Sequence, residues 1–323
     1  MERRDFLKIF SAASVAAMSG QMAIRSNVSQ PLAPLLSNTY EDIDTNALEL
    51  AKSIQYMTTP APDSGEILRA FARQGKAILA DSDNLQNYLQ KMENFENSHY
   101  EDVFLAPRQN ALLASTFRRL DRVQNLVGHG NFNVLSFDEM LKYGRRYSSV
   151  GEFPVDEKDF LEDLFSGNAR RYGFFGEKVI TELTSTVAPR EVKKIPYTGH
   201  FLYRGESEEL YKQVKRDLGE SIVLTSGIRS VVKQTHLFLA KTVQSKGNLS
   251  RASRSVAPPG HSFHGIGDFD VGKVGLGAKN FTADFAATDE FKRLVDLGYV
   301  DMRYPLHNLL GVRYEPWHIK VLT

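Results

Sequence analysis

Three short segments in the last third of the chain combine histidines, acidic residues and arginine at spacings that suit hydrolytic chemistry. They are SGIRSVVKQ (226–234), PPGHSFHGIGDFDVG (258–272) and RYPLHNLLGVRYEPWH (303–318). A hydrolytic zinc site needs three protein ligands, an open position for water, a carboxylate base and a cation for the developing oxyanion. The three segments hold all of these residue types, and together they predict a zinc peptidase site.

The absence of cysteine from the 323 residues restricts the metal ligands to histidine and carboxylate side chains. It also excludes disulfides, iron–sulfur clusters and a cysteine nucleophile. Of the 8 histidines, only His261, His264 and His318 lie in dense, motif-like surroundings. We interpret His261 and His307 as loop histidines or as neighbours of the ligands.

The spacing of Glu315 and His318 suits a base beside a metal ligand. Pro316 and Trp317 separate them, so a rigid turn can bring both side chains to one water molecule. Trp317 would exclude bulk water and so strengthen the electrostatic interactions within the site.

The three segments resemble the D-Ala-D-Ala carboxypeptidase branch of the lysostaphin/D-Ala-D-Ala peptidase/hedgehog group of zinc metallopeptidases. That family has the patterns SGYRSxxxQ, SxHxxGxAxD and ExWH, in this order. This chain has Ser226 to Ser230 with Gln234, Ser262-Phe263-His264 with Gly267, and Glu315-Pro316-Trp317-His318. The resemblance covers about residues 205–323.

The resemblance implies a role for each matching residue. Glu315 would be the general base, and Arg229 would hold the substrate carboxylate or the scissile carbonyl. Ser262 and Gln234 would contact the substrate or support the residues that do. The implied zinc ligands are His264, Asp270 and His318.

The third metal ligand departs from the family pattern. The family's aspartate lies seven residues after its histidine, whereas Asp270 lies six residues after His264. On a strand, a shift of one residue turns a side chain to the other face. We favour Asp270, because Gly265 and Gly267 can adopt backbone angles that absorb the missing residue. Asp268 is the alternative ligand, and a defective metal site is the third possibility.

The sequence around these motifs alternates between helix and strand patterns, which indicates an α+β domain over residues 155–323. Residues 191–205 and 220–230 contain β-branched and aromatic runs bounded by glycine and proline, which is typical of strands. Residues 207–219 predict a helix that ends at Gly219. The resemblance implies a small antiparallel sheet with flanking helices.

The first half of the chain predicts a mostly helical region, residues 41–150, whose role the sequence does not indicate. Its clearest amphipathic helix covers residues 111–126. Residues 128–133 (GHGNFN) lack the Lys-Ser/Thr of a phosphate-binding loop, and we interpret them as a turn. Residues 26–40 are polar and contain proline, which is typical of a linker.

Residues 1–25 resemble a twin-arginine export signal. Arg3 and Arg4 precede Phe6, Leu7 and Lys8, and a mildly apolar run follows. This run is shorter than the roughly 20 apolar residues that a membrane-spanning helix needs, so no stable span is expected. The pattern predicts export to the periplasm by the twin-arginine machinery, and it leaves open retention by an uncleaved signal.

The motifs together predict an exported zinc-dependent D,D-carboxypeptidase-like hydrolase that acts on peptidoglycan stem peptides. The 40 Lys+Arg against 39 Asp+Glu give a net charge of +1, which offers no electrostatic argument for binding nucleic acid. One alternative is a same-fold peptidase of other specificity: a D,D-dipeptidase, an L,D-carboxypeptidase or an endopeptidase. The other is a non-catalytic cell-wall-binding protein.

Overall fold

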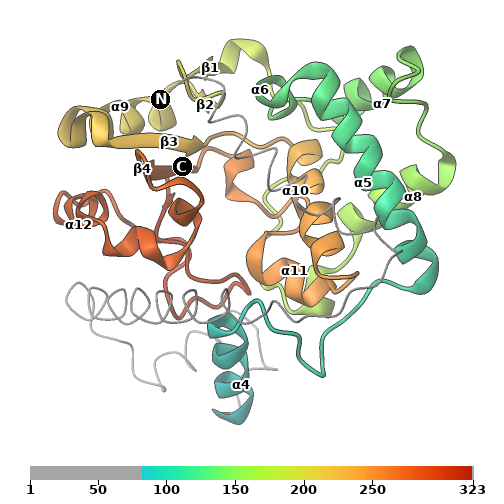
Figure 1. Cartoon of the computed structure of the whole chain (residues 1–323), viewed down its shortest axis with the longest axis horizontal. Coiled ribbons are helices and arrows are strands. Elements are labelled where there is room, and N and C mark those ends of the chain that lie inside the picture. Colours follow the sequence, from blue (N-terminus) through green and yellow to red (C-terminus); the bar gives the residue numbers. More distant parts are fainter. Residues whose placement is uncertain (1–81, 322–323) are drawn as a thin grey trace, which may run out of the picture.

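The computed structural model describes residues 82–321. The signal and the linker predicted for residues 1–40, and the first part of the helical region at 41–81, lie outside the described residues. Figure 1 shows a group of helices that includes α5, α8, α10 and α11 on one side, the strands β3 and β4 with α9 and α12 on the other, and α4 below both. No helix within residues 82–321 combines the length and the apolar character needed to cross a membrane.

The first part of the described chain is helical, as predicted. It contains α4 (Ser82–Glu93), α5 (Pro107–Val127), α6 (His129–Phe132), α7 (Phe137–Arg146) and α8 (Val155–Ser166). Helix α5 begins with a proline in its first turn, where no intrahelical N–H is needed, and it confirms the amphipathic helix predicted at 111–126. The interpretation of residues 128–133 as a turn was wrong in part, because residues 129–132 form the short helix α6.

The second part mixes strands and helices, which confirms the predicted α+β class. Helix α9 ends with Gly219 as its C-cap, as its sequence predicts. The strands and helices are β1 (Val192–Lys194), β2 (Phe201–Tyr203), α9 (Glu206–Leu218), β3 (Ile222–Ser226), α10 (Val231–Gln244), α11 (Leu249–Ser255), β4 (Phe269–Lys273), α12 (Asp289–Asp296) and β5 (His318–Ile319). Short 3₁₀ helices cover Ala169–Tyr172, Pro189–Glu191, Gly219–Ser221, Phe263–Gly265, Gly277–Phe281 and Ala283–Ala287.

The strands form two small antiparallel sheets. Strands β1 and β2 pair as a hairpin, and β4 lies between β3 and β5 in the three-stranded sheet. In this second sheet Asp270 pairs with Ser226 on one side and with His318 on the other. The register therefore places Asp270 of the second motif between His318 of the third motif and Ser226, the first residue of the first motif.

Side-chain alternation separates the two faces of the three-stranded sheet. Phe269 and Val271 of β4 and Ile319 of β5 belong to a core that also contains residues of α9 and α12. Because successive strand residues point to opposite faces, Asp270 and His318 point away from that core. The apolar neighbours of Asp270 and His318 in the sequence thus determine which face of the sheet carries these two polar side chains.

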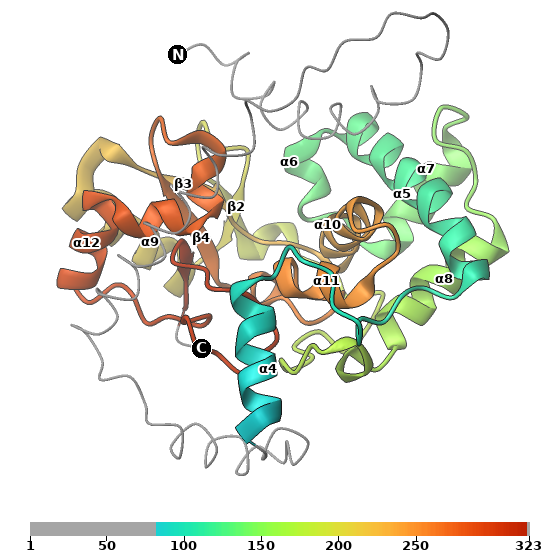
Figure 2. The same ribbon diagram turned by 60° about the horizontal axis from the view of Figure 1, so that its bottom comes forward.

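A second core joins the two parts of the chain. It contains Leu120 of α5 and Phe160 of α8 together with Phe238 of α10, and it extends to Tyr304 and Val312. Figure 2 shows α10 and α11 beside α5 and α8. The domain bounds predicted at 150 and 155 stay a prediction, since residues on both sides of them pack into one core.

A buried ion pair connects the segment after α4 to α11. Asp102 accepts hydrogen bonds from Arg254 Nη1 at 2.8 Å and Nη2 at 3.1 Å, and both side chains are at most 4 % exposed. Asn248 Nδ2 and the His99 backbone N–H also donate to this carboxylate, at 2.7 and 3.0 Å. The carboxylate is therefore fully hydrogen-bonded, and removal of its charge would leave Arg254 buried without a counter-ion.

We expect Asp102→Asn to lower the free energy of unfolding by about 3–5 kcal/mol at neutral pH, because it breaks a buried pair. Burial raises the pKa of Asp102, but hydrogen bonds from Arg254, His99 and Asn248 together lower it to about 2. With a folded pKa below the unfolded one, the contribution is complete above about pH 4 and disappears as the pH falls towards 2. Urea unfolding at several pH values measures both effects. A variant as stable as the wild type, with the same loss on acidification, would contradict this prediction.

Candidate metal centre

Three side chains from separate parts of the chain meet on the face of the three-stranded sheet that points away from the core with α9 and α12. One ligand atom from each of His264, Asp270 and His318 lies within 4.8 Å of the other two, and all three residues are buried. Asp270 Oδ1 is 3.2 Å from His264 Nε2 and 3.1 Å from His318 Nδ1. We call these three residues the metal centre, since two imidazoles and one carboxylate are a ligand set that suits zinc.

Each member of the metal centre is held by a different element. Asp270 and His318 are cross-strand partners on β4 and β5, and such partners lie next to each other on the same face. His264 lies in the 3₁₀ helix Phe263–Gly265 just before β4. The ligand atoms therefore meet through sheet register and one tight turn.

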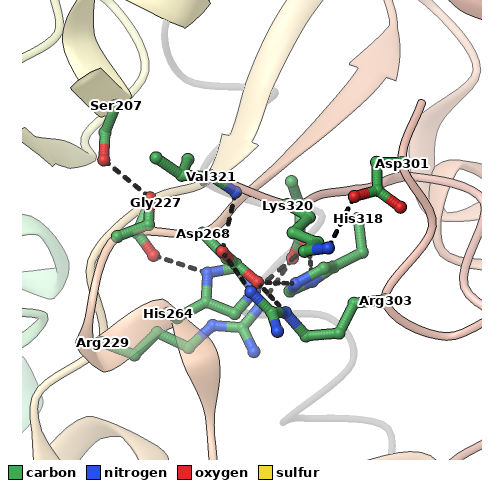
Figure 3. A network of polar contacts seen from close by, with 12 residues as sticks. Ser207, Gly227, Arg229, His264, Asp268, Asp301, Arg303, His318, Lys320 and Val321 are labelled. Carbon is green, nitrogen blue, oxygen red and sulfur yellow. Dashed lines mark hydrogen bonds and ion pairs between the residues drawn. The ribbon is translucent and has the colours of Figure 1, made fainter. Parts of the chain in front are cut away.

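Hydrogen bonds on the far sides of the two imidazoles determine which nitrogens face the centre. His264 Nδ1 is 2.8 Å from the Gly227 carbonyl oxygen, so Nδ1–H donates and Nε2 keeps its lone pair for a metal. His318 Nε2 is 2.8 Å from Asp268 Oδ2, which leaves Nδ1 for the metal. Figure 3 shows both contacts.

The structure separates the two aspartates that the sequence left as alternatives. Both lie on the same face, since they are two residues apart and Phe269 between them points into the core. Asp270 contacts Nε2 of His264 and Nδ1 of His318, the two nitrogens available to a metal. Asp268 instead contacts Nε2 of His318, on the opposite side of the ring. Asp270 is thus the residue in ligand position.

A glycine accommodates the six-residue spacing between His264 and Asp270. Gly267 has a φ of 134°, a backbone angle that other residues rarely adopt. The backbone N–H groups of Gly267 and Asp268 both donate to the Phe263 carbonyl oxygen, at 3.1 and 3.2 Å. This turn leads into β4 with Asp270 on the same sheet face as His318.

The charges around the metal centre shift the pKa values of its members in opposite directions. Burial and the charge of Arg229 lower the pKa of His264 to about 4. Burial alone would lower the pKa of His318, but hydrogen bonds to Asp268 and Asp270 raise it to about 9. His264 is therefore a neutral ligand at pH 7, whereas a metal has to displace a proton from His318.

Glu315 lies in the turn that precedes His318. Its backbone carbonyl oxygen accepts from the His318 N–H at 3.2 Å, and its own N–H donates to the Tyr304 carbonyl oxygen at 3.1 Å. Burial raises the pKa of the half-buried carboxyl group to about 7, although a nearby divalent cation would lower it again. Within residues 82–321 its side chain forms no hydrogen bond, so its carboxylate remains available as a base.

Arg229 lies beside the metal centre, but it contacts the ligand carboxylate. Its Nη2 is 2.6 Å from Asp270 Oδ2, and its Nε donates to Ser226 Oγ at 2.9 Å. Nη1 has no hydrogen-bond partner among the described residues, so one edge of the guanidinium is available. Arg229 thus orients Asp270, and its contact with a substrate stays a prediction.

The two other candidate residues, Gln234 and Ser262, occupy different settings. Gln234 is 2 % exposed, and its amide donates to the Ala257 carbonyl oxygen, so it supports the chain that leads to Ser262. Of the two roles that the resemblance allows, the geometry of Gln234 favours support. Ser262 lies two residues before His264, and its hydroxyl forms no hydrogen bond within the described part of the chain.

Sequence reasoning missed three groups that hold the ligands: the Gly227 carbonyl, Arg303 and Asp268 in a supporting role. Arg303 donates to Asp268 through Nε and through Nη2, the latter at 3.2 Å. The alternation Asp268-Phe269-Asp270 is the available sequence signal, because it places two carboxylates on one strand face. Nothing comparable in the sequence marks Arg303.

We expect Gly227→Ala to weaken both the fold and the metal centre. A Cβ at this position would lie 2.1 Å from the Phe201 carbonyl oxygen, so the backbone must move. Such overpacking typically costs about 1–3 kcal/mol, and here it displaces the carbonyl that orients His264. Urea unfolding and zinc titration should both show a loss.

Gly298→Ala is the control, because its Cβ would meet open space although the φ of 75° makes it strained. It should lower stability and leave metal affinity unchanged. Equal metal affinity in Gly227→Ala and the wild type would show that this carbonyl is not needed.

The fold and the site define an α+β domain with a His–Asp–His metal centre and a carboxylate one turn before the last ligand. Residues 204–322 match the family described as VanY, D-alanyl-D-alanine carboxypeptidase. This part of the chain is therefore a domain of that family of zinc carboxypeptidases, which confirms the resemblance. The match does not extend to the helices α4 to α8, and none of the curated proteins compared with the chain matches it.

Three solved structures are similar to part of the chain at low identity. The vancomycin-resistance D,D-pentapeptidase VanY from a VanB-type cassette, a mutant in complex with Zn(II), is 24 % identical; the match covers 41 % of this chain and 79 % of that one, with a TM-score of 0.33. The L,D-carboxypeptidase LdcB is 23 % identical over 42 % and 69 %, with a TM-score of 0.35. VanYB in complex with D-alanine-D-alanine is 20 % identical over 46 % and 85 %, with a TM-score of 0.34.

Proposed function

We propose that the chain is a zinc-dependent D,D-carboxypeptidase that releases the terminal D-alanine from peptidoglycan stem peptides. The observation that carries this proposal is the metal centre with Glu315 in the turn that leads into its last ligand, in a domain of the D-alanyl-D-alanine carboxypeptidase family. Zinc-dependent peptide hydrolysis uses a Lewis acid, a base and a stabilised oxyanion, and the residues present could hold the metal and supply the base and a cation for the oxyanion.

Glu315 and Arg229 would have separate roles in the reaction, beside a metal held by the metal centre. A bound zinc ion would supply polarisation of the scissile carbonyl and of the attacking water. Glu315 would take the proton from this water and pass it to the leaving amine. Arg229 would keep Asp270 in place through Nη2, and its Nη1 would be available to a substrate oxygen.

The test is incubation of the purified protein with defined muropeptides, with and without a metal chelator. We expect loss of the terminal D-alanine from a pentapeptide stem, inhibition by the chelator and recovery when zinc is added back. Release of a dipeptide, cleavage of a tetrapeptide or opening of cross-links would instead assign a peptidase of another specificity. No cleavage together with no bound zinc would indicate the non-catalytic wall-binding protein.

We further propose that the protein acts in the periplasm after export by the twin-arginine route. The support is the sequence pattern of residues 1–25, in which Arg3 and Arg4 precede an apolar run. Replacement of both arginines by lysine should keep the protein in the cytoplasmic fraction. An unchanged distribution between the fractions would reject this route.

A further inference from the structure

We infer that Asp268 is a positioning residue that orients His318 for metal binding. The inference rests on the proposed metal centre and concerns a carboxylate that is not in ligand position. His318 Nδ1 faces Asp270, and the opposite nitrogen, Nε2, is 2.8 Å from Asp268 Oδ2. A buried carboxylate therefore contacts this histidine at the nitrogen that does not face Asp270, and Figure 3 shows the contact between Asp268 and His318.

The Asp268 carboxylate is itself held from several sides. Its Oδ1 accepts from the Val321 backbone N–H at 2.9 Å, and Arg303 donates to both oxygens. The residue is only 2 % exposed, so water does not compete strongly for these contacts. Asp268 is thus fixed relative to β5 as well as to β4.

This contact determines the tautomer of His318. A carboxylate accepts hydrogen bonds only, so Nε2 keeps its proton towards Asp268. Nδ1, which faces Asp270, is therefore the nitrogen that gives up its proton and supplies the lone pair when a metal binds. Without Asp268 the other tautomer would become accessible, and the ring would lose its fixed orientation. Partners of this kind, which hydrogen-bond a metal-binding histidine, typically contribute 10–100-fold to metal affinity.

Arg303 connects this arrangement to the other histidine of the metal centre. Its guanidinium lies 3.6 Å from the centroid of the Phe263 ring, and Phe263 directly precedes His264. It also balances the charge of Asp268, just as Arg229 balances that of Asp270. Each of the two neighbouring carboxylates thus has an arginine of its own, which reduces their mutual repulsion.

The test compares the zinc affinity of the wild type, Asp268→Asn and the control Asp102→Asn by competition with a chromogenic chelator. Both substitutions convert a buried, arginine-paired carboxylate to an amide, so both are expected to lower stability. Only Asp268→Asn should lower zinc affinity, by about 10–100-fold. It should also change the visible absorption spectrum of the cobalt(II)-substituted protein, which reports on ligand geometry.

The outcomes separate this inference from the proposed function. If the wild type binds zinc and Asp268→Asn binds it equally well with the same cobalt spectrum, the positioning role is rejected and the metal centre stands. If the wild type binds no zinc, both proposals fail.

Arg303→Lys covers the case in which Asp268→Asn does not fold, because it keeps Asp268 and loosens its support. Its zinc affinity should lie below that of the wild type. An unchanged affinity and cobalt spectrum would overturn the inference.

Discussion

Glu315→Gln is expected to lower kcat for D-alanine release by about 10²–10⁴-fold, because an amide cannot accept the proton of the attacking water. The substitution keeps the size of the side chain. It also breaks no hydrogen bond among the described residues, since the Glu315 side chain forms none there. Zinc content and unfolding free energy should therefore stay close to those of the wild type, and KM should change little.

Steady-state kinetics with a defined pentapeptide, together with elemental analysis, would measure this effect. Glu290→Gln is the matched control. Glu290 lies on α12 and is also partly buried, and its Oε2 is 2.9 Å from Lys273 Nζ on β4. It should leave kcat within a few-fold of the wild type. If Glu315→Gln kept activity within tenfold of the wild type while binding zinc, Glu315 would not be the base.

His264→Ala is expected to remove both bound zinc and activity, with activity falling to the detection limit. Two remaining ligands do not hold zinc firmly, and the buried Asp270 would lose one of its two imidazole neighbours. Removal of the metal from the wild type with a chelator should have the same effect on activity. Added zinc should restore the chelated wild type but not the variant.

His261→Ala is the matched control for this prediction. His261 is buried like His264, but its Nδ1 lies 2.9 Å from the Glu177 carbonyl oxygen and its ring contacts Phe174. It lies only three residues from His264, so the local stability cost should be similar. We expect His261→Ala to keep its zinc, and His264→Ala with full zinc content would contradict the assigned ligand set.

The helical region shows how little a sequence reveals about the role of a packing surface. Its helices are evident from their periodicity, but their contact with the segment that precedes Glu315 is not. The Tyr88 hydroxyl on α4 accepts from the Gly311 N–H and donates to the Asn308 carbonyl oxygen, both at 2.9 Å. Tyr304 and Val312 lie in the core shared with α5. These helices therefore support the segment that leads to Glu315.

Local patterns were enough to predict the residue types of the metal centre and the α+β class. The spacings around His264 and around Glu315–His318 are properties of short segments, which is why they are visible without a structure. The helix that ends at Gly219 and the amphipathic helix at 111–126 are equally local, because their caps and apolar stripes lie within the helices themselves.

The assignment of Asp270 and Asp268 to different sides of His318 was decided by the tertiary structure. Asp268 directly precedes β4 and contacts His318, as does Asp270, so side-chain alternation cannot distinguish the two aspartates. What distinguishes them is the pairing of Asp270 with His318 on β5, a strand 48 residues further along the chain. Sheet register of this kind depends on the packing of apolar residues such as Phe269 and Ile319 into a common core, and no single segment contains that information.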